Sequence, residues 1–160
     1  MGMLTQTDLK QRLHYDPNTG VFTWLTAKGR RVDQIGKAAG NMSPHGYLRI
    51  TVNGRSYFAH RLAWLYMTGE HPRDCVDHSN MDKADNRWEN LRAATKSENG
   101  ANSKARGASG LKGAYWSKQI NRWYSRIGKR YLGTFDTPEQ AHEAYVEAAK
   151  DEFGGFARAV

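Results

Sequence analysis

Four polar residues in the middle of the chain have side chains that could together catalyse the hydrolysis of a phosphodiester bond: Asp77, His78, Asn90 and Asn99. Such hydrolysis needs a deprotonated water and a cation that neutralises the charge developing on the leaving oxygen. A neutral imidazole accepts a proton readily near neutral pH, so His78 is the candidate general base. Asn90 could accept the proton on the far ring nitrogen of His78, which would fix the tautomer of the ring.

Asp77 and Asn99 offer hard oxygen ligands for a divalent cation. A carboxylate and an amide oxygen suit Mg²⁺ or Mn²⁺, with phosphate and water completing the coordination shell. An amide oxygen is a poor ligand for zinc, so we expect Mg²⁺ or Mn²⁺ as the cofactor. Neighbouring residues of a strand point to opposite faces, and Asp77 and His78 can therefore share one site only if their strand ends or bends there.

The elements around these residues are predicted in the order strand, loop, strand, helix. They are a strand at 75–76 that delivers the Asp-His pair, a polar loop over 79–89, a strand at 91–94 and a helix that begins near Lys96. Thr95 and Glu98 form a T-x-x-E capping box, which is typical of a helix start. Taken alone, Asp77 and His78 could instead be a loop-stabilising carboxylate and a surface imidazole.

The segment from Val76 to Asn99 has the pattern DH-x-N-x-D-x-x-DNR-x-x-NLR-x-AT-x-x-EN. It resembles the motif of HNH endonucleases, as found in phage and intron-encoded homing nucleases. The resemblance implies a ββα-metal fold in which His78 is the general base and Asn90 orients it. It also implies that Asp77 and Asn99 bind the metal. Many members of this family have His at the last position of the motif, and the asparagine here resembles their HNN subset.

The C-terminal region separates its charges. Residues 104–130 contain eight Lys or Arg and no acid, whereas the acids of the last third all lie within 136–152. We expect three antiparallel strands, near 114–116, 123–127 and 129–132, with an acidic helix behind them. One face of this sheet should present bases and aromatic rings to DNA, namely Lys118, Arg122, Tyr124, Arg126, Lys129 and Tyr131. Trp116 is a further candidate DNA-binding residue. The alternative is a stabilising sheet whose charges only keep the protein soluble.

This region also resembles the DNA-binding domain of plant ethylene-response factors, the Apetala type. The resemblance rests on R-W-x-x-x-I at 122–127, YLGTFDT at 131–137 and the helix pattern from Glu139 to Ala149. It implies a sheet that reads the major groove of duplex DNA, and such domains occur fused to HNH nucleases. Several arginines of the usual first strand are replaced here, so no base specificity is carried over.

The remaining sequence indicates a β-rich N-terminal unit. Thr7 is the expected cap of a first helix, and Asn53-Gly54 is the turn of a hairpin. A helix over 60–68 should end at Gly69, with His60 as a helix-start residue and not a ligand. Scattered bases of this unit could meet phosphates, although such residues are more often solvated: Lys28, Arg30, Arg31, Lys37, Arg49 and Arg55.

These patterns together predict an α+β fold in four parts. They are an N-terminal β-rich unit (1–59), the ββα-metal core (60–104), a linker (105–110) and a sheet packed on one helix (111–160). The single cysteine, Cys75, excludes an intrachain disulfide and a Cys-rich zinc ribbon, which fits a reducing cytoplasm. No apolar run approaches membrane-spanning length, so we expect a soluble intracellular protein, in a phage-infected bacterial host.

The net charge of +8 favours a polyanionic partner. The sequence thus predicts a metal-dependent endonuclease acting on double-stranded DNA, with no obligate protein partner. One ββα site holds one metal, so a monomer would nick and a homodimer could cut both strands. The first alternative is a sequence-specific DNA-binding regulator that retains an inactive nuclease fold, and the second is an RNA-binding module.

Overall fold

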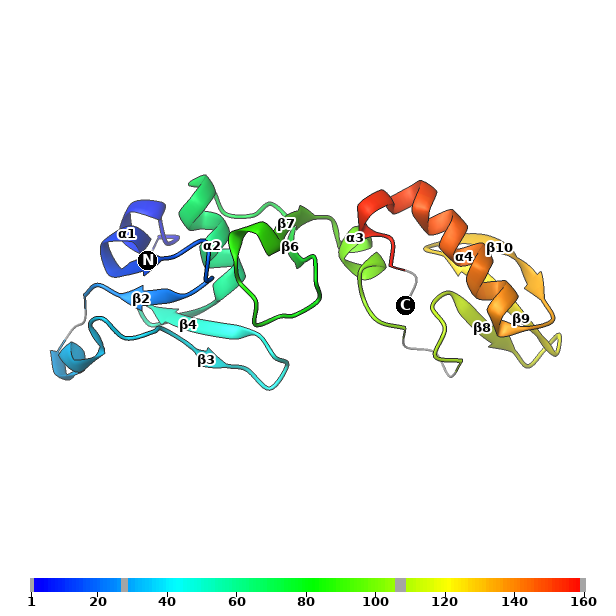
Figure 1. Ribbon diagram of the computed structural model, residues 1–160, viewed down its shortest axis with the longest axis horizontal. Helices are drawn as coiled ribbons and strands as arrows, with labels where there is room; N and C mark the ends of the chain where they lie inside the picture. The colour runs from blue at the N-terminus through cyan, green and yellow to red at the C-terminus, as the bar shows by residue number, and fades with distance from the viewer. Residues whose placement is uncertain (1, 27–28, 106–108, 159–160) are drawn as a thin grey trace. The chain divides into compact units, whose positions relative to one another are not determined.

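The computed structural model describes residues 2–26, 29–105 and 109–158, and of residues 29–31 it describes the backbone alone. The chain folds into two compact units, which are Met1–Ala94 and Thr95–Val160 (Figure 1). Each unit is described by itself. Both units combine helices with small antiparallel sheets. Among the bases that could meet phosphates, Lys28 and the side chains of Arg30 and Arg31 lie outside the described residues.

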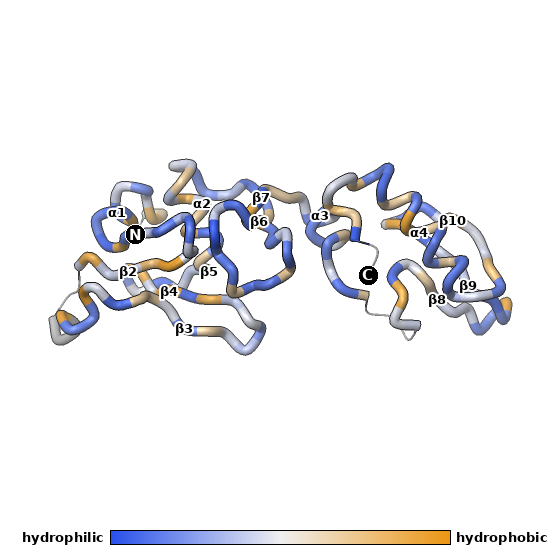
Figure 2. The backbone as a smooth tube through the Cα atoms, viewed as in Figure 1, coloured by the Kyte–Doolittle hydropathy of each residue, from blue (hydrophilic) through white to orange (hydrophobic). Residues whose placement is uncertain are grey.

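The described residues of the first unit form three small antiparallel sheets and two α-helices. Its elements are α1 (Gln6–Arg12), β1 (Leu13–Tyr15), β2 (Phe22–Trp24), a 3-10 segment (Gly29–Gln34), β3 (Asn41–Met42), β4 (Leu48–Val52), β5 (Arg55–Phe58), α2 (Ala59–Thr68), β6 (Cys75–His78), a 3-10 turn (Trp88–Asn90) and β7 (Leu91–Ala94). The sheets pair β1 with β2, β3 with β4 and β5, and β6 with β7. Hydrophilic residues dominate the loop between β6 and β7 (Figure 2).

Local sequence signals account for several of these elements. Asn53 and Gly54 both have positive φ, 54° and 77°, and close the hairpin of β4 and β5 as predicted. Gly69 ends α2 in the left-handed conformation, also as predicted. The prediction of Thr7 as the first cap was wrong. Thr5 accepts a hydrogen bond from the Asp8 N–H, and the reciprocal bond to the Asp8 carboxylate completes a capping box two residues earlier.

A hydrophobic core fills the described part of the first unit. Its largest fully buried side chains include Leu9 of α1, Tyr15 of β1, Phe22 of β2, Ile50 of β4 and Leu62 of α2. The same cluster extends to Val76 and Leu91 in β6 and β7. The predicted boundary between residues 59 and 60 therefore falls within one packed unit, and the four-part division of the chain stays a prediction.

The second unit contains α3 (Lys96–Ala101), β8 (Ala114–Ser117), β9 (Arg122–Ile127), β10 (Arg130–Phe135), α4 (Pro138–Phe153) and a 3-10 turn (Gly154–Phe156). The strands form one antiparallel sheet in the order β10-β9-β8, and α4 packs on it. Ile127 of β9 meets Tyr145, Ala148 and Ala149 of α4 in a small core. Residues 106–108 of the predicted linker lie outside the described residues.

Within the described parts of both units, none of the helices is long and apolar enough to cross a lipid bilayer.

Candidate active site

The candidate active site is built on the hairpin of β6 and β7. Asp77 pairs with Arg92 across the two strands, and His78 pairs with Leu91. The strand β6 ends at His78, which is where the sequence required it to end or bend. A turn follows directly, because the Met81 N–H donates to the His78 carbonyl (2.9 Å) and Met81 has a φ of 63°. Asp77 and His78 are both buried, each 5% exposed.

The imidazole of His78 contacts an asparagine that the sequence did not single out for this role. Its Nε2 lies 3.4 Å from Oδ1 of Asn86, a long hydrogen bond between two buried side chains. The Nδ2 of Asn86 donates to the Ala84 carbonyl (2.9 Å), so the amide oxygen is the end that faces the ring. Because a carbonyl oxygen can only accept, this contact places the proton on Nε2 and leaves Nδ1 as the basic nitrogen.

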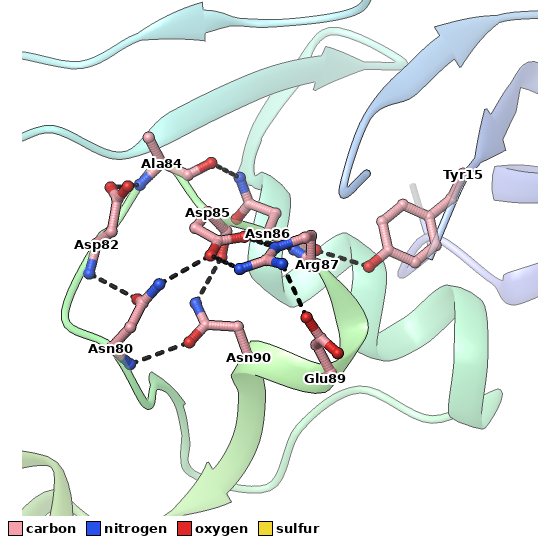
Figure 3. Close-up of polar contacts among 9 residues, drawn as sticks. All are labelled: Tyr15, Asn80, Asp82, Ala84, Asp85, Asn86, Arg87, Glu89 and Asn90. Atoms are coloured by element: carbon pink, nitrogen blue, oxygen red, sulfur yellow. Dashed lines mark hydrogen bonds and ion pairs between the residues drawn. The ribbon is translucent and has the colours of Figure 1, made fainter. Parts of the chain in front are cut away.

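The predicted bond between Asn90 and the His78 ring is not formed. The Asn90 Nδ2 donates to the Asp85 carbonyl (2.8 Å), and its Oδ1 accepts the Asn80 N–H (3.0 Å) (Figure 3). A long polar loop has backbone groups without sheet partners, and the asparagine amide satisfies two of them. Asn90 thus holds the two ends of the loop together, and Asn86 contacts the imidazole.

An ion pair fixes the middle of this loop. Both carboxylate oxygens of Asp85 accept from the guanidinium of Arg87, at 2.9 and 2.8 Å, and one of them also accepts from Nδ2 of Asn80 (2.8 Å) (Figure 3). These hydrogen bonds, those from Arg87 first, lower the pKa of Asp85 to about 2. Asp85 is therefore an anchor of the loop and stays ionised at neutral pH.

The N-terminal hairpin of β1 and β2 holds the same loop from outside. The buried Tyr15 hydroxyl donates to the Asn86 carbonyl (2.7 Å), and the Trp88 N–H donates to the Pro17 carbonyl (2.9 Å). Gly20 packs so closely that a Cβ there would lie 2.5 Å from the Arg87 nitrogen. Sequence reasoning missed this support, since no local pattern connects residue 15 with a loop 71 positions away.

A second histidine packs against His78. His60 at the start of α2 is 7% exposed, and its ring stands perpendicular to that of His78 with centroids 4.9 Å apart. Burial lowers the pKa of His60 to about 3. Burial also lowers the pKa of His78, against the opposing effect of its bond to Asn86. Both imidazoles are therefore neutral at neutral pH, the form that a general base requires.

Asp77 is held by a fork of two hydrogen bonds. Its Oδ2 accepts from Nε (3.0 Å) and Nη2 (2.9 Å) of Arg92, which pairs with it across the hairpin. Among the described residues, no group of three or more His, Cys, Asp or Glu side chains could hold a metal ion. One carboxylate suits a hard divalent ion that keeps several waters and phosphate oxygens as ligands. The donor chemistry of Asp77 therefore fits Mg²⁺ or Mn²⁺.

Asn99, the other predicted metal ligand, lies on α3 of the second unit. The capping box predicted for this helix is present, with Thr95 accepting from the Glu98 N–H and the Glu98 side chain accepting from the Thr95 N–H. The Asn99 N–H donates to the Thr95 carbonyl (3.0 Å) and so begins the helix. The assignment of Asn99 to the metal stays a prediction.

The predicted DNA-binding face of the second unit carries a row of tyrosines. Tyr124 of β9 stacks with Tyr115 of β8 (5.4 Å between centroids) and with Tyr131 of β10 (6.5 Å). The guanidinium of Arg126 lies 5.3 Å from the centre of the Tyr115 ring. Sequence reasoning placed Tyr124, Arg126 and Tyr131 on one face but did not choose Tyr115, whose position follows from the β8–β9 register.

Other residues of this predicted face have different surroundings. Trp116 pairs with Trp123, so it lies on the opposite side of the sheet from Tyr115, because neighbouring residues of a strand alternate. The assignment of Trp116 to DNA binding stays a prediction, and its ring is exposed. Arg122 forms an exposed ion pair with Asp136 (2.7 Å). Lys118 and Lys129 are exposed in the turns that join the three strands.

Comparison with known proteins identifies the central segment. Residues 57–101 match a family model of HNH endonucleases. This segment is an HNH endonuclease domain. It begins in β5, ends in α3 and includes the whole β6–β7 hairpin.

One solved structure to which the chain is similar is described as "DNA binding and cleavage by the HNH homing endonuclease I-HmuI". The sequences are 25% identical, and the TM-score is 0.43. The similarity covers 57% of this chain and 51% of the other, so the chain spans about half the length of that relative. No curated protein matches the sequence significantly. The resemblance of residues 111–160 to ethylene-response-factor domains stays a prediction.

Proposed function

We propose that this protein is a metal-dependent, homing-type endonuclease that hydrolyses phosphodiester bonds in double-stranded DNA. The observation that carries the proposal is the buried, neutral His78, whose Nε2 is engaged by Asn86 within the HNH domain. A neutral imidazole carries a proton on one nitrogen only, so the other nitrogen can accept a proton without first losing one. It is therefore ready to take a proton from water at neutral pH.

In the proposed reaction, Nδ1 of His78 accepts a proton from a water molecule as the water oxygen bonds to phosphorus. The bond from phosphorus to the leaving 3′ oxygen breaks, and that oxygen takes the electron pair. Asn86 keeps the ring oriented throughout, since its amide oxygen accepts the Nε2 proton. Asp77 would hold a divalent cation, with Asn99 as the predicted second ligand, and the cation would supply positive charge that stabilises the leaving oxygen. Arg92 keeps the Asp77 carboxylate in place from the neighbouring strand.

Duplex DNA is the proposed substrate because of charge and surface chemistry. The chain has a net charge of +8, which favours binding to a polyanion through the release of counterions. The face of the second unit with Tyr124, Arg126 and Tyr131 offers hydrogen-bond donors for phosphates and base edges. In this proposal the second unit holds the duplex, and the HNH domain cuts it.

The test is cleavage of supercoiled plasmid DNA in Mg²⁺ by the wild type and by His78→Ala. We expect the variant to lose cleavage by at least about a hundredfold and to retain DNA affinity, because only the proton acceptor is removed. His14→Ala is the matched control, since His14 is an exposed histidine of the same unit. Full activity of His78→Ala would refute the mechanism. A wild type that binds duplex DNA but does not nick it with any divalent ion would be the DNA-binding regulator.

A further inference from the structure

Four aromatic rings form a continuous cluster that ends on the candidate general base. Tyr47 lies between Phe58 (5.2 Å between centroids), His60 (5.4 Å) and His78 (6.1 Å). Phe58 stacks on His60 at 5.5 Å with an angle of 14° between the rings, and His60 contacts His78. The cluster reaches the surface at Phe58, which is 36% exposed. It therefore links the outside of the molecule to the imidazole of His78.

Two cations lie on the outer rings of this cluster. The guanidinium of Arg49 lies over Phe58, its direct partner across β4 and β5, at 5.2 Å from the ring centre. The ammonium group of Lys83, in the loop between β6 and β7, lies 4.8 Å from the centre of the Tyr47 ring. It also donates to the His45 carbonyl (3.1 Å). Both side chains thus lie on outer rings of the aromatic cluster that ends on His78.

The charges of these two cations are not neutralised locally. Neither Arg49 nor Lys83 forms an ion pair with a carboxylate in the described parts of the chain, and both residues are exposed. Two other basic residues of the β6–β7 hairpin and its loop differ, because Arg87 is paired with Asp85 and Arg92 with Asp77. A cation over an aromatic face still directs N–H groups toward solvent, where they can donate to an anion.

We propose that Arg49 and Lys83 form a phosphate-binding surface beside His78, and that it receives the backbone of the DNA strand to be cut. The inference rests on the proposed nuclease function and adds the residues that guide the substrate to the site. Two donors at separate points of one aromatic cluster suit the repeated phosphates of a nucleic acid strand better than a single small anion. This surface contacts phosphates and no bases, so it binds DNA of any sequence equally well.

The experiment measures binding of the full-length protein to a random-sequence duplex over a range of salt concentrations, in EDTA so that no cleavage occurs. Arg49→Gln and Lys83→Gln should each weaken binding by roughly five- to tenfold near 0.1 M salt. Each should also reduce the slope of log K against log salt by about 0.9, and the double variant by about twice as much. Arg49→Lys and Lys83→Arg should keep the wild-type slope, since they retain the charge.

The matched control is Lys10→Gln. Lys10 lies 4.9 Å from the centre of the Tyr66 ring, so it is also a cation on an aromatic face of the same unit, but its ring is outside the cluster that contacts His78. The slope of log K against log salt for Lys10→Gln should equal that of the wild type. Unchanged slopes for Arg49→Gln and Lys83→Gln, or an equal reduction for Lys10→Gln, would overturn the inference. Absence of plasmid nicking by the wild type would instead refute the nuclease proposal. The slopes measured in EDTA would still decide whether Arg49 and Lys83 bind phosphates.

Discussion

At the scale of single residues, the state of His78 depends on what touches its ring. Burial lowers its pKa, and the contact with Asn86 opposes that effect without adding a charge. Burial lowers the pKa of neighbouring His60 to about 3, so this ring brings no positive charge near His78 at neutral pH. Both rings are thus desolvated and neutral, and His78 can act as a base.

The pH dependence of cleavage should follow the charge at position 86. Cleavage requires neutral His78, so it declines as the pH falls through the pKa of that group, which lies below its ordinary value of 6.5. In Asn86→Asp a carboxylate would stabilise the imidazolium and raise this pKa. We therefore expect the acidic limb of the cleavage profile to move to higher pH by about one unit or more. Single-turnover rates on plasmid DNA between pH 4.5 and 8 would measure the shift.

Asn90→Asp is the comparison for that experiment. Asn90 bonds to the Asn80 N–H and the Asp85 carbonyl and does not contact the ring. This variant should be less stable, because a carboxylate cannot donate to the Asp85 carbonyl, but its acidic limb should stay close to that of the wild type. If the acidic limb of the cleavage profile moved further in Asn90→Asp than in Asn86→Asp, Asn90 and not Asn86 would be the residue that orients His78.

At the scale of elements, the loop between β6 and β7 is positioned by a hairpin that is distant in sequence. Tyr15 and Pro17 bond to the loop, and Gly20 packs against its backbone at Asn86 and Arg87. Two short strands and their turn therefore act as a support for the residue that orients the general base. Activity should be sensitive to changes in this hairpin although none of its residues is expected to contact substrate.

Gly20→Ala tests this support. Gly20 has a φ of 74°, so any side chain costs about 1–2 kcal/mol in the left-handed conformation. Its Cβ would also lie 2.5 Å from the backbone of Asn86 and Arg87, which must move. We expect a loss of stability and a cleavage rate at least tenfold lower, measured by thermal unfolding and by the plasmid assay.

Gly54→Ala separates the two effects in that experiment. Gly54 has a similar φ, 77°, but a Cβ there would meet nothing within 4 Å. This variant should lose stability through backbone strain alone and keep its cleavage rate below the melting temperature. Equal cleavage rates in the two variants would show that the hairpin does not position Asn86.

At the scale of the whole molecule, the chain consists of two units with separate hydrophobic cores. The core of the first extends over both helices and most of its strands, and that of the second is small, with Ile127 against Tyr145 and two alanines of α4. A small core buries little apolar area, so its stability depends strongly on each side chain. We infer that the units lose structure separately.

Ile127→Ala and Leu62→Ala would test this independence. Each removes a buried side chain, 3% and 1% exposed, and should cost about 2–5 kcal/mol in the unit that contains it. Hydrogen exchange should then show loss of protection in residues 95–160 for Ile127→Ala and in residues 1–94 for Leu62→Ala. Similar loss in both units for either variant would mean that the chain unfolds as one cooperative body.

The sequence by itself determined the features that depend on neighbouring residues. The turn at Asn53-Gly54, the cap at Thr95 and the strand, loop and strand around His78 all depend on short-range backbone preferences, and all are present. The motif from Val76 to Asn99 also identified the endonuclease domain. A catalytic motif requires certain residue types at a fixed spacing, so it can be recognised from the sequence alone.

Only the tertiary structure decided which side chains meet. Asn86 and Asn90 are the same residue type in one loop, and the fold of that loop selects Asn86 for His78 because both ends of the Asn90 amide are used by backbone groups. The bond from Tyr15 to this loop joins segments far apart in sequence, and so do the ring contacts that connect Phe58, which carries Arg49, to His60 and His78. Such contacts follow from the packing of a shared core, which no local period or spacing of residues describes.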